Sequence, residues 1–115
     1  MSKIRIKRLE SELTKLIGNV FNKKIRDKNL QWVTISDVDL SPDLQHAKIY
    51  FTYLEHKVEP EIMLKYISKT KGLIKNEIAK KKMMRTIPEI RYIYDDTEDK
   101  AQRIEHLLKE LKKDD

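Results

Sequence analysis

Glycine and proline are scarce in this chain of 115 residues, and their few positions divide it into long uninterrupted segments. The two glycines and three prolines are Gly18, Gly72, Pro42, Pro60 and Pro88. Because proline cannot continue a helix or a central strand, and glycine weakens either element, these positions mark expected boundaries. No internal repeat or flexible linker separates the segments, so we expect a single domain over residues 1–115, in which the last few residues are either ordered or disordered.

The first segment has the apolar periodicity of an amphipathic helix. Between Ile4 and Ile25 the apolar residues recur at spacings of three, four and one, which places them on one face. Gly18 costs such a helix about 1 kcal/mol relative to alanine. The apolar stripe continues past Gly18, so we predict one helix that ends near Asp27.

Two β-strands are predicted next, joined by a short Ser-Pro-Asp turn. The stretch Trp32–Leu40 is rich in β-branched residues, but its alternation changes phase between Ile35 and Val38. A bulge near Asp37 would return both halves to the same face. The stretch Ala47–Leu54 alternates without interruption and predicts the second strand.

The second half of the chain predicts two helices, a strand and a last helix. Pro60 suits the first turn of a helix. Gly72 interrupts the apolar pattern, so a second helix with a different axis is expected to follow it and to stop before Pro88. Alternating residues predict a strand at Ile90–Tyr94, and an amphipathic pattern predicts a helix at Ala101–Leu111.

The expected fold class is α+β. The predicted order is helix, strand, strand, helix, helix, strand and helix, which allows a three-stranded sheet with helices packed on one face. The connection between the second and third strands runs through helices and is expected to be right-handed.

Composition limits the function classes. The chain has no cysteine, so it can hold neither a disulfide nor a thiolate zinc site. It has no long apolar run, and Met1–Arg8 alternates Lys and Arg with Ile rather than forming a secretory signal. We therefore expect a cytoplasmic protein that does not enter membranes.

The net charge of +6 is concentrated in two blocks. Residues 1–30 carry nine Lys or Arg against three acids, and residues 69–85 carry seven against one. Dense blocks of one sign favour a polyanionic partner, although a merely solvated surface is the alternative.

The block Lys69–Arg85 has the features of a phosphate-binding element. On a helix that starts after Gly72, the side chains of Lys71, Lys75 and Lys82 would share one face. A helix start at a glycine would also expose backbone N–H groups to phosphate. If Gly72 needs a positive φ, a β-branched residue there should disturb the kink.

Three stretches of this sequence resemble ribosome-binding factor A. They are SDVDLSPDLQHAKIYFTYL (36–54), KGLIKNEIAKKKMMRTIPEIRYIYDD (71–96) and RIEHLLKEL (103–111). The resemblance implies a type II KH-like fold in which a kinked helix junction replaces the usual GxxG loop. It also implies binding to immature 30S subunits and 16S rRNA, and support for processing of the rRNA 5′ end under cold stress. Family members have an alanine two places before the glycine, where this chain has Thr70.

The resemblance implies a basic surface. It implies this only in the sense that positively charged residues occupy the matching positions. Together with the glycine of the kink and two arginines of the first helix, the predicted RNA-binding residues are Lys71, Gly72, Lys75, Lys80, Lys81, Lys82, Arg85, Arg5 and Arg8. The two arginines either extend the RNA footprint or solvate the outer face of their helix.

Aromatic residues leave two interpretations open. Tyr92 and Tyr94 on the third strand either stack on bases or pack in the core, as strand aromatics more often do. Trp32, at the head of a strand, is expected to pack.

No metal site, cofactor or catalytic group is predicted. His46, His56 and His106 lie far apart without ligand spacing. The pairs Asp37/Asp39 and Asp95/Asp96 are better explained by a turn and by helix capping than by magnesium. No phosphate-binding loop or activated nucleophile is present.

The competing hypothesis is a protein-interaction module that docks through the C-terminal helix. A third hypothesis is membrane-surface binding by the first helix, which would need apolar bulk exposed there. We expect an RNA-binding protein that is not an enzyme, is a monomer when free, and binds neither membrane nor DNA.

Overall fold

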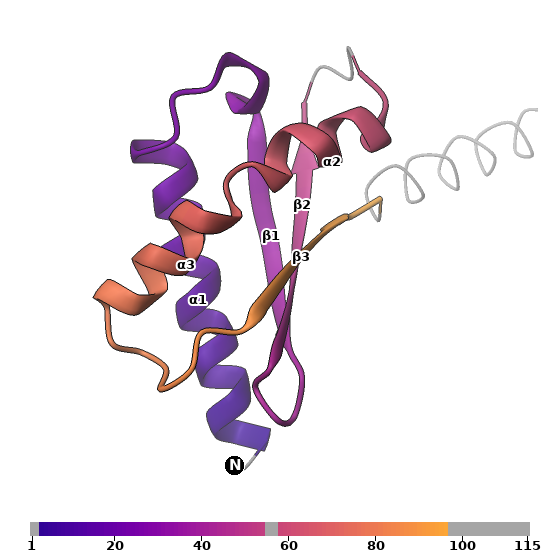
Figure 1. Cartoon of the computed structure of the whole chain (residues 1–115). Coiled ribbons are helices and arrows are strands. Elements are labelled where there is room, and N and C mark those ends of the chain that lie inside the picture. The colour runs from indigo at the N-terminus through magenta and orange to yellow at the C-terminus, as the bar shows by residue number, and fades with distance from the viewer. Residues whose placement is uncertain (1–2, 55–57, 97–115) are drawn as a thin grey trace, which may run out of the picture.

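A computed structural model of the chain describes residues 3–54 and 58–96. Its elements in chain order are α1 (Lys3–Lys23), η1 (Lys28–Leu30), β1 (Val33–Leu40), β2 (His46–Tyr53), α2 (Pro60–Ser68), α3 (Lys71–Lys80) and β3 (Glu89–Tyr94) (Figure 1). This order confirms the predicted α+β arrangement up to the third strand. The helix predicted at residues 101–111 lies outside the described residues, as do His56 and His106.

The three strands form a mixed sheet in the order β1-β2-β3. β1 and β2 are antiparallel and β2 and β3 are parallel. The register of β1 shifts between Ile35 and Asp37, which confirms the predicted bulge. Because of this bulge, Val33, Ile35, Val38 and Leu40 are all buried on the same face of the sheet.

The helices pack on that buried face. α1 contacts β1, α2 contacts β3, and α1 and α3 contact each other (Figure 1). Ile17, Ile67 and Ile74, one from each helix, have an exposed fraction of 1% or less. The strands contribute aromatic rings to the same core, including Phe51, whose centroid lies 6.4 Å from that of Tyr92.

The junction between α2 and α3 is built around Thr70 rather than Gly72. Thr70 is buried, and its hydroxyl donates to the Ile67 carbonyl at 2.7 Å. The same Oγ1 lies 2.7 Å from Tyr92 Oη in β3, and because the one Thr70 proton goes to the Ile67 carbonyl, the Tyr92 hydroxyl donates to Thr70. α3 already begins at Lys71, so Gly72 lies in its first turn.

The expectations for Gly72 and Trp32 were wrong. Neither glycine has a positive φ, and a Cβ added at Gly72 would meet nothing within 4 Å. The bend between α2 and α3 lies at the residues before Gly72. The helix α3 therefore does not start after a glycine. Trp32 is 50% exposed because it precedes β1 at the rim of a hollow instead of pointing into the core.

None of the helices within residues 3–54 and 58–96 combines the length and apolar character needed to span a bilayer.

Candidate nucleic-acid interface

One face of helix α3 packs against the core, and lysines lie on both sides of that face. Ile74, Glu77 and Ile78 form its buried face. Helical spacing then places Lys71 and Lys75 on one flank and Lys80 on the other. The lysines of α3 therefore lie along both sides of the helix.

Ion pairs confirm that the two flanks face different elements. Lys75 Nζ lies 3.2 Å from Glu89 Oε1 at the start of β3. On the other flank, Lys80 Nζ lies 3.7 Å from Glu77 Oε1, which also accepts from Lys24 Nζ just after α1 at 2.7 Å. Two of the predicted RNA-binding lysines are thus already paired with carboxylates.

Between the flanks, α3 exposes a strip without charge. Gly72, Asn76 and Ala79 are all exposed and follow one another at helical spacing. Because no long side chain covers this strip, a polymer backbone can approach the helix closely while cations reach it from both sides.

The end of α3 concentrates cations that have no ion pair with any residue in the described ranges. The helix stops at Lys80, and Lys82 has a φ of 52°, in the left-handed region. The amide of Lys82 donates to the Ala79 carbonyl at 3.1 Å, which closes the helix end. Lys81, Lys82 and Arg85 are all exposed. Lys82 therefore does not continue the helical row predicted for it.

The two arginines of α1 lie at the same end of the molecule. Leu9 of α1 lines a hollow of ≈ 410 Å³ together with Met83, Met84 and Arg85. Arg5 and Arg8 are exposed within about one turn of Leu9. The structure thus brings the first-helix arginines near the segment that follows α3.

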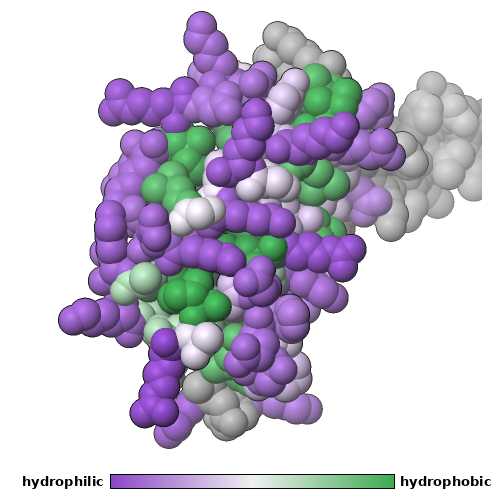
Figure 2. Space-filling view, in the orientation of Figure 1, coloured by the Kyte–Doolittle hydropathy of each residue, from purple (hydrophilic) through white to green (hydrophobic). Residues whose placement is uncertain are grey.

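The surface view agrees with this distribution. Figure 2 shows hydrophilic side chains projecting along the edge of the molecule that carries α3, with hydrophobic patches between them. The cations are not gathered into one continuous row, but they border the same exposed helix and the turn after it.

Glu77 is a buried acid beside the predicted RNA-binding lysines, and it is not among the residues predicted from the sequence. It is 4% exposed, and the hydrogen bond from Lys24 lowers the pKa of its carboxyl, with a further contribution from the charge of Lys80. Its spacing from Ile74 and Ile78 places it on the apolar face, and this was the available signal. An acid at such a position within a basic block predicts an internal ion pair.

Of the β3 tyrosines, Tyr92 belongs to the core and Tyr94 packs against it, partly buried. Tyr92 is 5% exposed, and burial raises its pKa to about 12, partly offset by the hydrogen bond with Thr70. The ring of Tyr94 lies 5.9 Å from that of Phe51 and 5.5 Å from that of Tyr53. For Tyr92, core packing is therefore the correct interpretation.

One member of each acidic pair accepts a hydrogen bond within the described residues. Asp37 accepts from the amide of Val38 at 2.9 Å, and Asp95 accepts from the hydroxyl of Ser36 at 3.0 Å. Within the described part of the chain, three or more His, Asp or Glu side chains nowhere come together as a metal site.

Comparisons with known proteins agree on one family. The family profile described as ribosome-binding factor A matches residues 5–108. Ribosome-binding factor A of Staphylococcus carnosus (strain TM300) is 33% identical over 115 residues, which is 100% of both chains.

Solved structures share the fold. The crystal structure of ribosome-binding factor A from Thermus thermophilus has a TM-score of 0.69 at 21% identity, covering 77% of this chain and 94% of that one. Coordinates of the Thermus thermophilus factor fitted into a cryo-EM map of a 30S complex have a TM-score of 0.63 at 21% identity, covering 77% and 93%. At this identity the likeness establishes the fold.

Proposed function

Because this chain belongs to the ribosome-binding factor A family, we propose that it binds the small (30S) ribosomal subunit by gripping the backbone of 16S rRNA along α3. The observation that carries the proposal is the arrangement of α3, in which an exposed uncharged strip lies between two flanks of lysine. A phosphate backbone needs long cationic side chains on a rigid element, and this helix supplies them.

The proposed phosphate contacts differ in how readily each cation can make them. Lys71, Lys81, Lys82 and Arg85 have no carboxylate partner among the described residues and are available to phosphate without breaking an ion pair. Lys75 and Lys80 would first have to leave Glu89 and Glu77. Phosphate contacts carry no sequence information, so recognition of the correct rRNA segment would come from its shape.

The finer parts of the proposal follow from the family. The protein would act late in maturation of the small subunit and support processing of the 5′ end of the 16S rRNA, including during adaptation to cold. It would work in the cytoplasm as a monomer, through binding rather than catalysis, and without a cofactor. Arg5 and Arg8 would extend the footprint from α1, and Gly72 would leave room for the backbone.

The proposal is tested with the triple variant Lys71→Gln, Lys81→Gln and Lys82→Gln. This variant removes three positive charges and leaves the Glu77 and Glu89 ion pairs intact. Co-sedimentation with purified small subunits is measured over a series of salt concentrations. Each lost phosphate contact should reduce the slope of log K against log salt by about 0.7–0.9, so the triple variant should lose about 2–3 units.

A matched control makes the same charge change elsewhere. The variant Lys48→Gln, Lys65→Gln and Arg91→Gln also loses three exposed cations, two of them from the outer face of the sheet. It should keep most of the affinity and of the salt slope. Equal weakening in the two folded variants would refute α3 as the RNA-binding element.

A further inference from the structure

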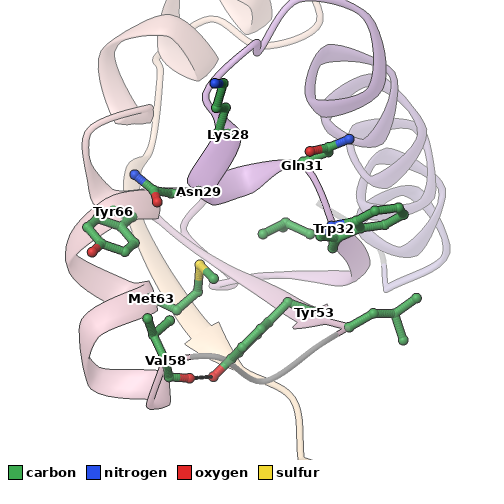
Figure 3. Close-up of a pocket in the computed structure, with 10 residues that line it drawn as sticks. Lys28, Asn29, Gln31, Trp32, Tyr53, Val58, Met63 and Tyr66 are labelled. Carbon is green, nitrogen blue, oxygen red and sulfur yellow. Dashed lines mark hydrogen bonds between the residues drawn. The ribbon is translucent and has the colours of Figure 1, made fainter.

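A second hollow lies at the opposite end of the sheet from the hairpin turn. It has a volume of ≈ 210 Å³ and is formed by η1, the start of β1, the end of β2, and α2. Figure 3 shows Tyr66 and Trp32 on opposite sides of this hollow, with Met63 between them. None of these three residues belongs to the surface of α3.

The walls offer flat aromatic surface. Trp32 is 50% exposed, although burial of so large an apolar ring would stabilise the fold. Tyr66 is half-buried against the core, and Met63 is buried beneath the hollow. A ligand that enters the hollow would therefore meet a deformable thioether and the ring of Tyr66, with the ring of Trp32 at the rim (Figure 3).

The rim of the hollow is polar and basic. Lys28, Asn29 and Gln31 line one side, and their side chains can donate hydrogen bonds to a ligand edge. Lys28 at the rim and Arg26, two residues before it in the chain, are exposed and have no ion pair with another residue of the described ranges. These cations would attract an anionic group at the edge of the hollow. A groove that binds an uncharged apolar side chain would not need them.

The residues around the hollow are held in place before any ligand binds. Tyr53 Oη donates to the Val58 carbonyl at 2.7 Å, which ties the end of β2 to the start of α2. The carboxylate of Asp27 accepts from the amide of Asn29 at 2.9 Å and caps η1. A preorganised site loses less conformational entropy on binding.

We propose that the hollow between Trp32 and Tyr66 binds an unstacked base of single-stranded RNA, with Arg26 and Lys28 on the adjoining phosphates. Single-stranded RNA is recognised by stacking splayed bases on aromatic side chains while cations track the backbone. The inference rests on the proposed function in taking RNA as the partner. It adds a base-dependent contact that is separate from the phosphate-dependent surface of α3.

Trp32 is the single tryptophan of the chain, so its fluorescence reports directly on this hollow. The full-length protein is titrated with an octamer of riboadenylate and with an abasic octamer of the same length and charge. The adenylate octamer should quench Trp32 in a saturable manner. The abasic octamer should bind α3 without quenching, as followed by anisotropy of a labelled strand.

Two matched variants test whether the quenching arises from binding at this hollow. Tyr66→Leu keeps apolar bulk and removes one π-face, so the octamer concentration at half-quenching should rise roughly 5- to 150-fold, the range for loss of one stacked base. Tyr50→Leu makes the same change on the outer face of the sheet and should leave quenching unchanged. Thermal unfolding of each variant confirms that it remains folded.

Three results would overturn the inference. The first is equal quenching by both octamers, which would show a phosphate effect alone. The second is an emission spectrum typical of a buried indole that the adenylate octamer does not alter, since another part of the chain would then fill the hollow. The third is an unchanged response in Tyr66→Leu.

The α3 triple glutamine variant separates this inference from the proposed function. If only the hollow fails, base-dependent quenching is missing while that variant still loses binding to the small subunit. If only α3 fails, the triple variant binds the subunit normally while the base-dependent quenching persists.

Discussion

The contact between Thr70 and Tyr92 gives a quantitative prediction about how the α2–α3 junction is held. Thr70→Val removes a hydroxyl and keeps the branched shape of the side chain. The Ile67 carbonyl keeps the amide of Thr70 as a donor at 3.0 Å, but the buried Tyr92 hydroxyl loses its partner. Leaving such a group unsatisfied costs about 1–3 kcal/mol, and we expect the free energy of unfolding to fall by that amount.

Tyr92→Phe should be milder. It removes the second hydroxyl, but Thr70 Oγ1 still donates to the Ile67 carbonyl. The expected loss is about 0.5–1.5 kcal/mol, the net value of one hydrogen bond. In the double variant no hydroxyl is left without a partner, so the two losses should not add.

The assay is urea unfolding of the protein, the two single variants and the double variant. The double variant should be more stable than the sum of the single losses implies, by about 0.5–1.5 kcal/mol. The reasoning is wrong if the losses add to within about 0.3 kcal/mol, because independent sites behave in that way.

Alkaline titration checks the same contact by a second route. Burial raises the pKa of Tyr92 to about 12 from an ordinary value of 10.0. Well below its ordinary pKa the hydroxyl is protonated in both the folded and the unfolded state. As the pH rises from 10.0 towards about 12 the unfolded tyrosine loses its proton first, so stability should fall by up to about 2–3 kcal/mol. Tyr92→Phe should lack this component, whereas the lysine titrations remain in both proteins.

The remaining predictions concern the two ends and the inner face of α3. Gly72→Ala should raise the free energy of unfolding by about 0.5–1 kcal/mol, because Gly72 is helical with open space around it. Lys82→Gly should also stabilise, by about 1 kcal/mol, because it relieves a left-handed non-glycine residue. Urea unfolding checks both, and a loss of stability would contradict the assigned backbone. The lowered pKa of Glu77 contributes stability above its ordinary pKa of 4.5 that is lost as the pH falls through the folded-state value. Glu77→Gln should therefore flatten the acid limb of a stability–pH curve, and an unchanged limb would remove Glu77 as its cause.

The order of elements and the bulge could be predicted because they depend on local patterns. Ile35 and Val38 can share a face only if one residue between them is unpaired, and the register of β1 meets that requirement at Ser36. Similarly, the uninterrupted alternation of 47–53 corresponds directly to the buried face of β2.

The junction and the lysine surface could not be predicted from local patterns, because their determinants lie far away in the sequence. The partner of Thr70 is Tyr92, which follows it by 22 residues, and the partner of Glu77 is Lys24, which precedes it by 53. Nothing in the local pattern indicates that α3 stops at Lys80. The predicted helix included Lys82 and placed it on one face with Lys71 and Lys75. Because α3 ends at Lys80, Lys82 does not lie on that face.

The inward-facing residues at α3 hold the helix in place, and the outward-facing lysines are the ones proposed to bind phosphate. Thr70 and Glu77 face inward and fix the position of the helix against β3 and the end of α1. Lys71 and Lys81 lie outside these contacts and form no ion pair within the described residues. Changes to the inner pair should therefore alter unfolding, and changes to the outer pair should alter the salt dependence of binding. Because Lys80 touches Glu77 while its side chain stays 69% exposed, it is the position where one substitution should affect both measurements.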